Sequence, residues 1–294
     1  MQKVPKLKSV CVSCMLNSRI NQFPEDAPEE KKVEYMTRVL KELGEMKDAH
    51  GPVLATRNIV KLQAELFGKK QDYSELKSKF NQFVMEKVPF LKREIEKADD
   101  SFKRAVQYGI VGNYIDFAVM EHVDENQLEQ FFIDAAQYAL DEVTYQTMRQ
   151  DVCNAKRIVY LLDNCGEIVI DMLIIEEVKR LNPQAKITAI VRGEEAMNDA
   201  TMEDAKEVGL DELVDVIGNG SDILGTCLKY ISEEARTVIE EADVILSKGQ
   251  GNFETLLGYD KNIYYIFLCK CEMIAEMFGV EKFSPMLVKE KVVD

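Results

Sequence analysis

The residues best suited to chemistry in this sequence follow an apolar run at residues 158–162. The run ends abruptly in DNCGE, residues 163–167, so two carboxylates and an amide come directly after a segment typical of a buried strand. Carboxylate and amide oxygens are the hard ligands that Mg²⁺ and Mn²⁺ prefer. Asp and Asn are also common N-caps, so a helix beginning near Gly166 would account for the same pair without any ligand.

Polar or glycine-rich segments follow four further apolar runs, at residues 187–191, 214–217, 244–247 and 264–268. These segments are Arg192-Gly193-Glu194 with Asn198-Asp199 shortly after, Gly218-Asn219-Gly220-Ser221, KGQGNFE at residues 248–254, and Cys269-Lys270-Cys271. Ligands of open α/β sheets bind outside the carboxyl ends of the strands. Because all five expected strands are followed by such segments, we predict one shared ligand-binding site at this edge of the sheet.

Each group in these segments has a chemical reason to be there. Asp163, Asn164 and Asp199 could hold a divalent cation and leave coordination positions open for water and phosphate. Lys248 is a compact cation suited to a phosphoryl oxygen, and Arg192 could bind the same group or simply pair with a carboxylate. Taken singly, each has an ordinary alternative, such as an N-cap or a surface charge.

Two loops could also bind an anion through their backbone amides. One is the turn that contains Gly220 and Ser221, and the other begins at Gly249. Glycine-rich turns connect many α/β elements, so neither loop is specific by itself.

The elements that must position these groups differ between the two halves of the chain. Residues 1–150 show helical spacing of apolar residues, with candidate helices at 31–47, 56–67, 73–98 and 126–145, and with Pro89 as an expected boundary or kink. Residues 151–294 alternate apolar strands with helices at 168–181, 201–208, 228–241 and 253–257. This alternation predicts an α/β domain with a doubly wound, parallel sheet behind a helical N-terminal domain.

Composition excludes several classes of protein. A formal net charge of −15 over 294 residues argues against a nucleic-acid partner. No apolar run approaches the length of a membrane span, and the N-terminus lacks the features of a signal peptide. Seven scattered cysteines predict reduced thiols in a cytoplasmic protein rather than a disulfide framework.

Common nucleotide-binding motifs are absent from the chain. No Gly-x-Gly-x-x-Gly follows the first strand, and no Walker pattern occurs. The two histidines, His50 and His122, lie beside none of the motifs. The chemistry that remains is metal-assisted attack on a phosphate ester.

Taken together and in this order, the motifs resemble those of the damage-control phosphatase family, also catalogued as domain of unknown function 89. The resemblance rests on GNYIDF at residues 112–117, DNCGE, the RG…NDAT segment at 192–201 and KGQGNFE, and it covers nearly the whole chain. CVSC at residues 11–14 resembles the CxxC that marks the prokaryotic branch. The family implies a Rossmann-like α/β/α domain beside a helical one. It also implies a metal-dependent phosphatase acting on small phosphometabolites, such as sugar phosphates and damaged or surplus cofactor precursors.

The resemblance also implies roles for individual residues. The metal, commonly Mn²⁺, Mg²⁺, Co²⁺ or Ni²⁺, would be held by Asp163, Asn164 and Asp199. Lys248 would bind the phosphoryl group with Glu254 close to it, and both join Asp163 as the predicted catalytic residues. The predicted substrate- and phosphate-binding residues are Asn113, Asp116, Glu167, Arg192, Gly220, Ser221 and Lys248. Of these, Asn113 and Asp116 would close the pocket from the helical domain.

Several alternatives remain open at this stage. The attacking group is expected to be water, with Asp163 as a covalent nucleophile the alternative. Cys11 and Cys14 could be a structural or redox pair, half of a second metal site, or simply buried. A protein that binds a metal and a phosphate ligand without turnover, or a carboxyl methyltransferase, would use similar residues. Substrate identity and oligomeric state are not readable from the sequence.

Overall fold

The five apolar runs form parallel strands of one sheet, and a sixth strand is added antiparallel at its edge. In the computed structural model, which describes residues 7–20, 23–24, 26–46, 51–68, 72–113, 130 and 132–290, the strand order is β3-β2-β1-β4-β5-β6. The strands are β1 (Arg157–Leu161), β2 (Lys186–Val191), β3 (Asp215–Gly218), β4 (Val244–Lys248), β5 (Ile263–Leu268) and β6 (Pro285–Lys289). The sequence did not predict β6, whereas the α/β class and the parallel core of the sheet are confirmed.

Consecutive apolar residues are needed because both faces of the sheet are covered. On β1, Ile158 and Tyr160 belong to the core on one face, and Val159 and Leu161 belong to the core on the other. Successive side chains of a strand point to opposite faces, so a strand buried on both sides is apolar throughout.

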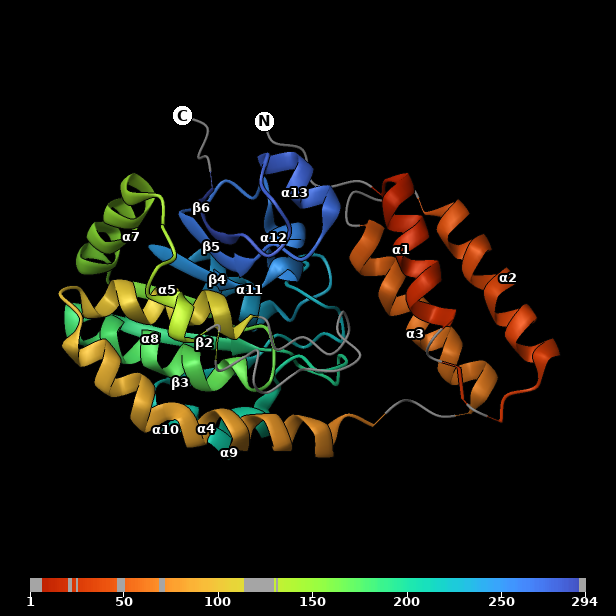
Figure 1. Ribbon diagram of the computed structural model, residues 1–294, viewed down its shortest axis with the longest axis horizontal. Helices are drawn as coiled ribbons and strands as arrows, with labels where there is room; N and C mark the ends of the chain where they lie inside the picture. The colour runs from red at the N-terminus through yellow and green to blue at the C-terminus, as the bar shows by residue number, and fades with distance from the viewer. Residues whose placement is uncertain are drawn as a thin grey trace.

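Two sets of helices supply these covering layers (Figure 1). One face carries α4 (Ser74–Lys97), α5 (Ser101–Gly112), α7 (Glu142–Asn154), α8 (Glu167–Leu181), α9 (Met202–Val208) and α10 (Leu210–Leu213). The other carries α11 (Glu233–Glu240), α12 (Gln250–Leu256) and α13 (Glu272–Phe278). No helix within the described ranges is long and apolar enough to cross a membrane.

The first three helices form a unit of their own beside the sheet. α1 (Ser9–Ile20), α2 (Glu29–Glu45) and α3 (Gly51–Phe67) lie together in Figure 1, and they share a small core that includes Tyr35, Val39 and Ile59. α4, α5 and α7 instead contribute to the main core under the sheet. The predicted boundary at residue 150 stays a prediction, but the packing joins the helices between residues 74 and 154 to the α/β part.

Several helix expectations differ from the structure: the helix expected at 228–241 begins only at Glu233, in α11, and the one expected at 56–67 already begins at Gly51, in α3. The single helix expected at 126–145 is wrong, because a turn precedes Asp141, whose side chain accepts a hydrogen bond from the Thr144 amide and begins α7. A short polar residue at an N-cap outweighs the continuing apolar spacing. Pro89 is not a boundary, since α4 continues through it.

The loops that follow β2 and β3 approach each other so closely that there is no room for a side chain at the point of contact. A Cβ atom on Gly193 would lie 2.1 Å from the backbone nitrogen of Gly220, whereas a Cβ atom on Gly44, in α2, would meet nothing within 4 Å. Backbone atoms cannot yield as the end of a flexible side chain can. This contact therefore fixes the spacing of two strand ends.

We expect Gly193→Ala to lower the free energy of unfolding by at least about 2 kcal/mol, because the added methyl group forces the two loops apart. Gly44→Ala is the matched control, and its gain in helix propensity should stabilise the chain by up to about 1 kcal/mol. Chemical denaturation of both variants checks the pair. Equal stability of the two variants would contradict the close approach.

Candidate metal and phosphate site

A cavity of about 370 Å³ lies at the carboxyl ends of the strands. Its α/β wall includes Asp163, Asn164, Asp199, Glu254 and Lys270, and its other wall comes from α1 and α3. The structure thus brings together the three predicted metal ligands, although Asp199 lies more than 30 residues after Asp163 and Asn164 in the sequence.

Backbone contacts fix these three residues against one another. Asn164 and Asp199 form an isolated antiparallel bridge, and the Ala200 amide donates to the Asp163 carbonyl at 2.7 Å. Gly166 has a φ of 69°, which allows the chain to turn sharply into α8. The segment at 196–200 is therefore attached to the end of β1 by main-chain hydrogen bonds.

Side-chain amides then orient the oxygens of the predicted ligands. Asn164 Nδ2 donates to Asp163 Oδ2 at 2.8 Å, and Asn198 Nδ2 donates to Asn164 Oδ1 at 2.8 Å. Asn113, at the end of α5, donates to Asp163 Oδ2 and to Glu167 Oε2, both at 3.0 Å. Asn113 is fully buried, so in this structure it positions Asp163 and does not line the cavity. Asp116, predicted beside it, lies outside the described residues.

Arg192 contacts the carboxylates from the protein interior and does not line the cavity. Its Nε donates to Asp199 Oδ2, and its Nη2 lies 3.5 Å from Asp163 Oδ1. The guanidinium is almost completely buried. Of the two roles considered for Arg192, pairing with a carboxylate is the one that the structure shows.

The carboxylates of the site repel one another. Burial raises the pKa of Asp163 well above its usual value, and the negative charges of Asp199 and Glu167 raise that pKa further. Arg192 and Lys270 oppose this effect only in part. Two carboxylates and an amide oxygen at one cavity wall suit a hard divalent cation, which would relieve the repulsion.

Lys248 lies in a buried network below the cavity. Its ammonium donates to Asp171 Oδ1 at 2.8 Å, to the Gly109 carbonyl at 2.9 Å and to Glu167 Oε1. Burial lowers the pKa of Lys248, but Asp171 and Glu167 outweigh it, so the pKa is raised overall. Lys248 is absent from the cavity lining, and its predicted contact with the phosphoryl group stays a prediction.

Glu167, also predicted to bind substrate, belongs to this network and not to the cavity lining. It is fully buried in the first turn of α8. Oε1 accepts from Lys248, and Oε2 accepts from the side chains of Asn113 and Asn164. Glu167 therefore links the buried cation to the predicted ligands.

The KGQGNFE segment contributes structure as well as chemistry. Asn252 Nδ2 donates to the carbonyls of Leu162 and Lys248, and so ties the ends of β1 and β4 together. Gly249, with a φ of 80°, leaves room for Asp163, because a Cβ atom there would lie 2.0 Å from Asp163 Oδ2. The motif thereby holds Asp163 between two strand ends.

Lys270 is a cation of the α/β part to which the sequence analysis assigned no role. It follows β5, lines the cavity and is only 7% exposed. Its backbone amide donates to Gln250 Oε1 at 3.2 Å, and Gln250 Nε2 donates to Glu254 Oε1 at 2.9 Å. The signal was present, since Lys270 follows a strand end as Lys248 does, but no motif marked it.

Glu254, the third predicted catalytic residue, does line the cavity. Burial raises its pKa from 4.5 to about 7, against a smaller opposing effect of Gln250. A carboxyl group with such a pKa can donate or accept a proton near neutral pH.

Gly220 and Ser221 do not reach the cavity in this structure. Ser221 Oγ accepts from the Ile223 amide at 3.2 Å, and the Ser221 amide donates to Asn219 Oδ1. Gly220 packs against Ser232 and Gly193. The two residues shape the turn after β3, and their predicted phosphate contact stays a prediction.

The cysteine pair lines the cavity from α1. Cys11 is buried, Cys14 is exposed, and both are free thiols, as is Cys271 on the opposite wall. Burial raises the pKa of Cys11, and it raises that of Cys271 to about 11, which disfavours the thiolate forms that bind metals or attack disulfides. Among the residues that the structure describes, no three His, Cys, Asp or Glu side chains lie together as a metal cluster.

Comparison with known proteins gives a consistent picture. The sequence pattern of the damage-control phosphatase ARMT1-like domain matches residues 7–286. A damage-control phosphatase of Archaeoglobus fulgidus is 37% identical over 77% of this chain and 78% of its own length. Another from Pyrococcus horikoshii is 30% identical and covers 97% of this chain and 99% of its own.

Two further similarities extend along the chain. An uncharacterized protein of Methanocaldococcus jannaschii is 33% identical over 97% of this chain and 95% of its own length. The crystal structure of a DUF89 family protein from Pyrococcus horikoshii superposes with a TM-score of 0.83 at 29% identity, covering 98% of this chain and all of that one. Both the sequence pattern and the fold match nearly the whole length of the chain, and the chain therefore belongs to the damage-control phosphatase family with an ARMT1-like domain.

Proposed function

We propose that this protein is a divalent-metal-dependent phosphatase that hydrolyses small phosphorylated metabolites in a metabolite damage-control role. The observation that carries the proposal is the meeting of Asp163, Asn164 and Asp199 at one cavity wall, with Lys270 lining the same cavity. The Archaeoglobus and Pyrococcus relatives are named damage-control phosphatases, which supports the same activity. The expected metals are Mn²⁺, Mg²⁺, Co²⁺ and Ni²⁺.

The protein groups divide the work around the phosphate ester. When bound, a divalent cation at Asp163, Asn164 and Asp199 supplies Lewis-acid polarisation of the phosphoryl oxygen and lowers the pKa of a bound water. Arg192 and Asn113 hold the two carboxylates in place, and Lys270 neutralises charge on the phosphoryl oxygens. Water as the attacking group fits the engagement of Asp163 Oδ2 by two amide donors.

Glu254 suits a proton donor to the departing oxygen. It lines the cavity, it is 9% exposed, and its pKa of about 7 keeps a substantial protonated fraction at neutral pH. A proton donated to the leaving oxygen allows the product to depart as a neutral alcohol instead of an alkoxide.

Asp163→Asn and Asp199→Asn should each lower metal-restored hydrolysis of para-nitrophenyl phosphate by at least about 100-fold, because each removes an anionic ligand. The measurement follows chelation with Mg²⁺, Mn²⁺, Co²⁺ and Ni²⁺ added back singly. Asp211→Asn, an exposed aspartate in α10, is the matched control and should retain activity.

Two outcomes would count against the proposal. If wild-type protein binds a metal by calorimetry but hydrolyses neither this surrogate nor a panel of sugar phosphates, the protein binds without turnover. If both Asp variants keep full activity, the metal site is elsewhere.

Substitutions of Lys270 and of Lys248 should have different effects, one on catalysis and the other on stability. Lys270→Met should lower kcat/KM by about 100-fold, because it removes a charge that faces the phosphoryl group. Lys248→Met should instead destabilise the fold by about 3–5 kcal/mol, because it leaves two buried carboxylates without their cation. A stable Lys248→Met protein with a raised KM would restore Lys248 as the phosphate-binding group.

The buried Glu254 should make stability depend on pH. Its folded-state pKa of about 7 exceeds the usual 4.5, so its contribution to stability is complete below pH 4.5 and is lost as the pH rises through 7. In chelated protein, Glu254→Gln should therefore raise the free energy of unfolding more at pH 8 than at pH 5, by up to about 3 kcal/mol, as measured by chemical denaturation at the two pH values. Parallel shifts at both pH values would show that Glu254 has an ordinary pKa.

A further inference from the structure

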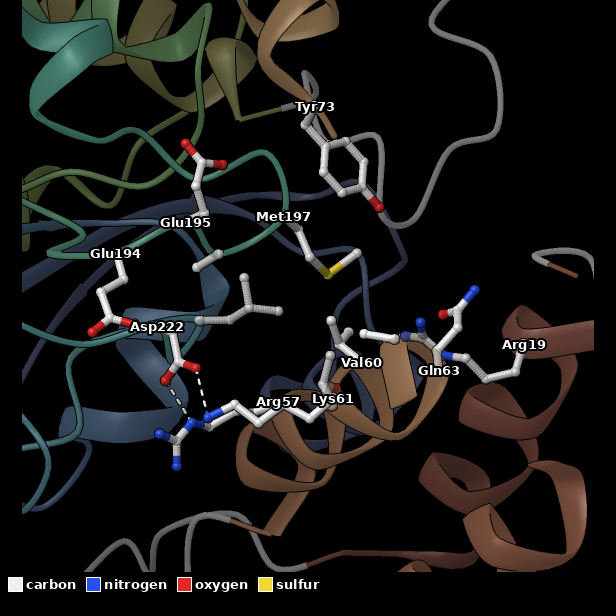
Figure 2. A pocket seen from close by; sticks show the side chains of 14 residues that line it. Arg19, Arg57, Val60, Lys61, Gln63, Tyr73, Glu194, Glu195, Met197 and Asp222 are labelled. Carbon is white, nitrogen blue, oxygen red and sulfur yellow. Dashed lines mark hydrogen bonds and ion pairs between the residues drawn. The ribbon is translucent and has the colours of Figure 1, made fainter. Parts of the chain in front are cut away.

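A second cavity, of about 290 Å³, adjoins the catalytic cavity. Four residues line both cavities: Arg19, Thr56, Met197 and Leu224. Figure 2 shows the second cavity between α3 and the segment that carries Glu194, Glu195 and Met197. A molecule whose phosphoryl group lies at Asp163 and Asp199 can therefore extend its remaining part past Met197 into this space.

The partition between the cavities is a strained residue. Met197 has a φ of 54°, a left-handed conformation that is uncommon outside glycine. It lines both cavities, and it directly precedes Asn198 and Asp199, which line the first cavity. Strained residues of this kind concentrate at functional sites.

The helical unit presents cations to this second cavity. Arg19 comes from α1, and Arg57 and Lys61 come from α3. The same cavity is also lined by Glu194, Glu195 and Asp222, so its charged side chains are of both signs. Figure 2 shows these three carboxylates on the opposite side of the cavity from Arg19.

Arg57 and Lys61 serve to attach α3 to the α/β part. Arg57 Nε lies 2.5 Å from Asp222 Oδ1, and Lys61 Nζ lies 2.8 Å from Asp222 Oδ2 (Figure 2). Both side chains are directed toward Asp222, at the opposite side of the cavity from Arg19. Their charge is committed to that carboxylate.

Arg19 occupies the junction of the two cavities. It is only 6% exposed, yet it contributes to the walls of both. Burial raises the pKa values of Tyr35 and Tyr73, and the positive charge of Arg19 opposes that rise in each. A buried guanidinium at a junction between cavities is suited to bidentate binding of a carboxylate or phosphate.

We propose that Arg19 binds a second anionic group of the substrate, so that the preferred substrates are phosphomonoesters that carry a further carboxylate or phosphate. This inference rests on the proposed phosphatase function, because it assigns the reacting phosphoryl group to the first cavity. The apolar side chains of Val60, Met197 and Leu224 then contact the part of the molecule between its two charged ends. The substrate class is a compact dianionic ester with an anionic tail.

The test uses matched probes that differ only in the tail. Butyl phosphate has a neutral tail, 4-(phosphonooxy)butanoate has a carboxylate, and butane-1,4-diyl bisphosphate has a second phosphate; shorter and longer homologues cover the unknown span. Hydrolysis in the presence of Mn²⁺ gives kcat/KM for each. The corresponding phosphonates, which cannot be hydrolysed, give dissociation constants by calorimetry.

Wild-type protein should favour the best charged-tail probe over the neutral one by about 10- to 100-fold, the range for charge-assisted hydrogen bonds. Arg19→Gln should reduce that ratio to within about twofold of one, and Arg19→Lys should restore part of it. Lys61→Gln is the matched control, and it should leave the ratio as in the wild type. The tail that shows the larger ratio distinguishes carboxylate from phosphate.

The readouts separate this inference from the proposed function. Hydrolysis of butyl phosphate with no preference for charged tails in either rate or binding would overturn the role of Arg19 and leave the phosphatase intact. A binding preference that depends on Arg19 without hydrolysis of any probe would support the anion site and overturn the phosphatase. A preference that survives Arg19→Gln would move the site to other residues and refute the inference.

Discussion

The site depends on gathering four carboxylates at one end of a buried sheet. Asp163, Asp199, Glu167 and Asp171 are all buried, and like charges in a poorly solvated region repel strongly. Two buried cations make the arrangement possible, Arg192 for the first pair and Lys248 for the second. Burial still raises the pKa of Asp171 to about 7, so the compensation is incomplete. Residual repulsion at Asp163 and Asp199 is what a cation in the cavity would relieve.

This constraint explains why residues from so many elements meet at one point. Lys248 donates a hydrogen bond to the Gly109 carbonyl of α5, and Asp163 accepts one from the side-chain amide of Asn113 at the end of the same helix. Asn252 then holds the ends of β1 and β4 at a fixed spacing. Four motif residues, Asn113, Arg192, Lys248 and Asn252, therefore act on the geometry of the cavity-facing oxygens and do not line the cavity themselves.

The two parts of the chain have different tasks in the proposed enzyme. The α/β part with α4, α5 and α7 supplies the predicted ligands, Lys270 and Glu254, which is the chemistry common to phosphate esters. The α1–α3 unit covers the cavity and supplies Arg19 at its junction with the second cavity. Specificity can then change in the helical unit without disturbing the buried ion pairs that the reaction requires.

The sequence by itself determined the fold class, the five parallel strands within one residue or so of their observed ends, and the three residues that meet as predicted metal ligands. Those features follow from local patterns, because a strand covered on both faces is apolar throughout and the ends of parallel strands share one edge. Tertiary structure decided which polar groups face the cavity. Lys248 and Lys270 both follow strands, and nothing in their local sequence shows that the first lies among carboxylates beneath the site and the second beside the cavity. The same holds for Arg19, which is an ordinary helical residue until α1 packs against the α/β part, because burial and partner choice depend on contacts between segments far apart in the chain.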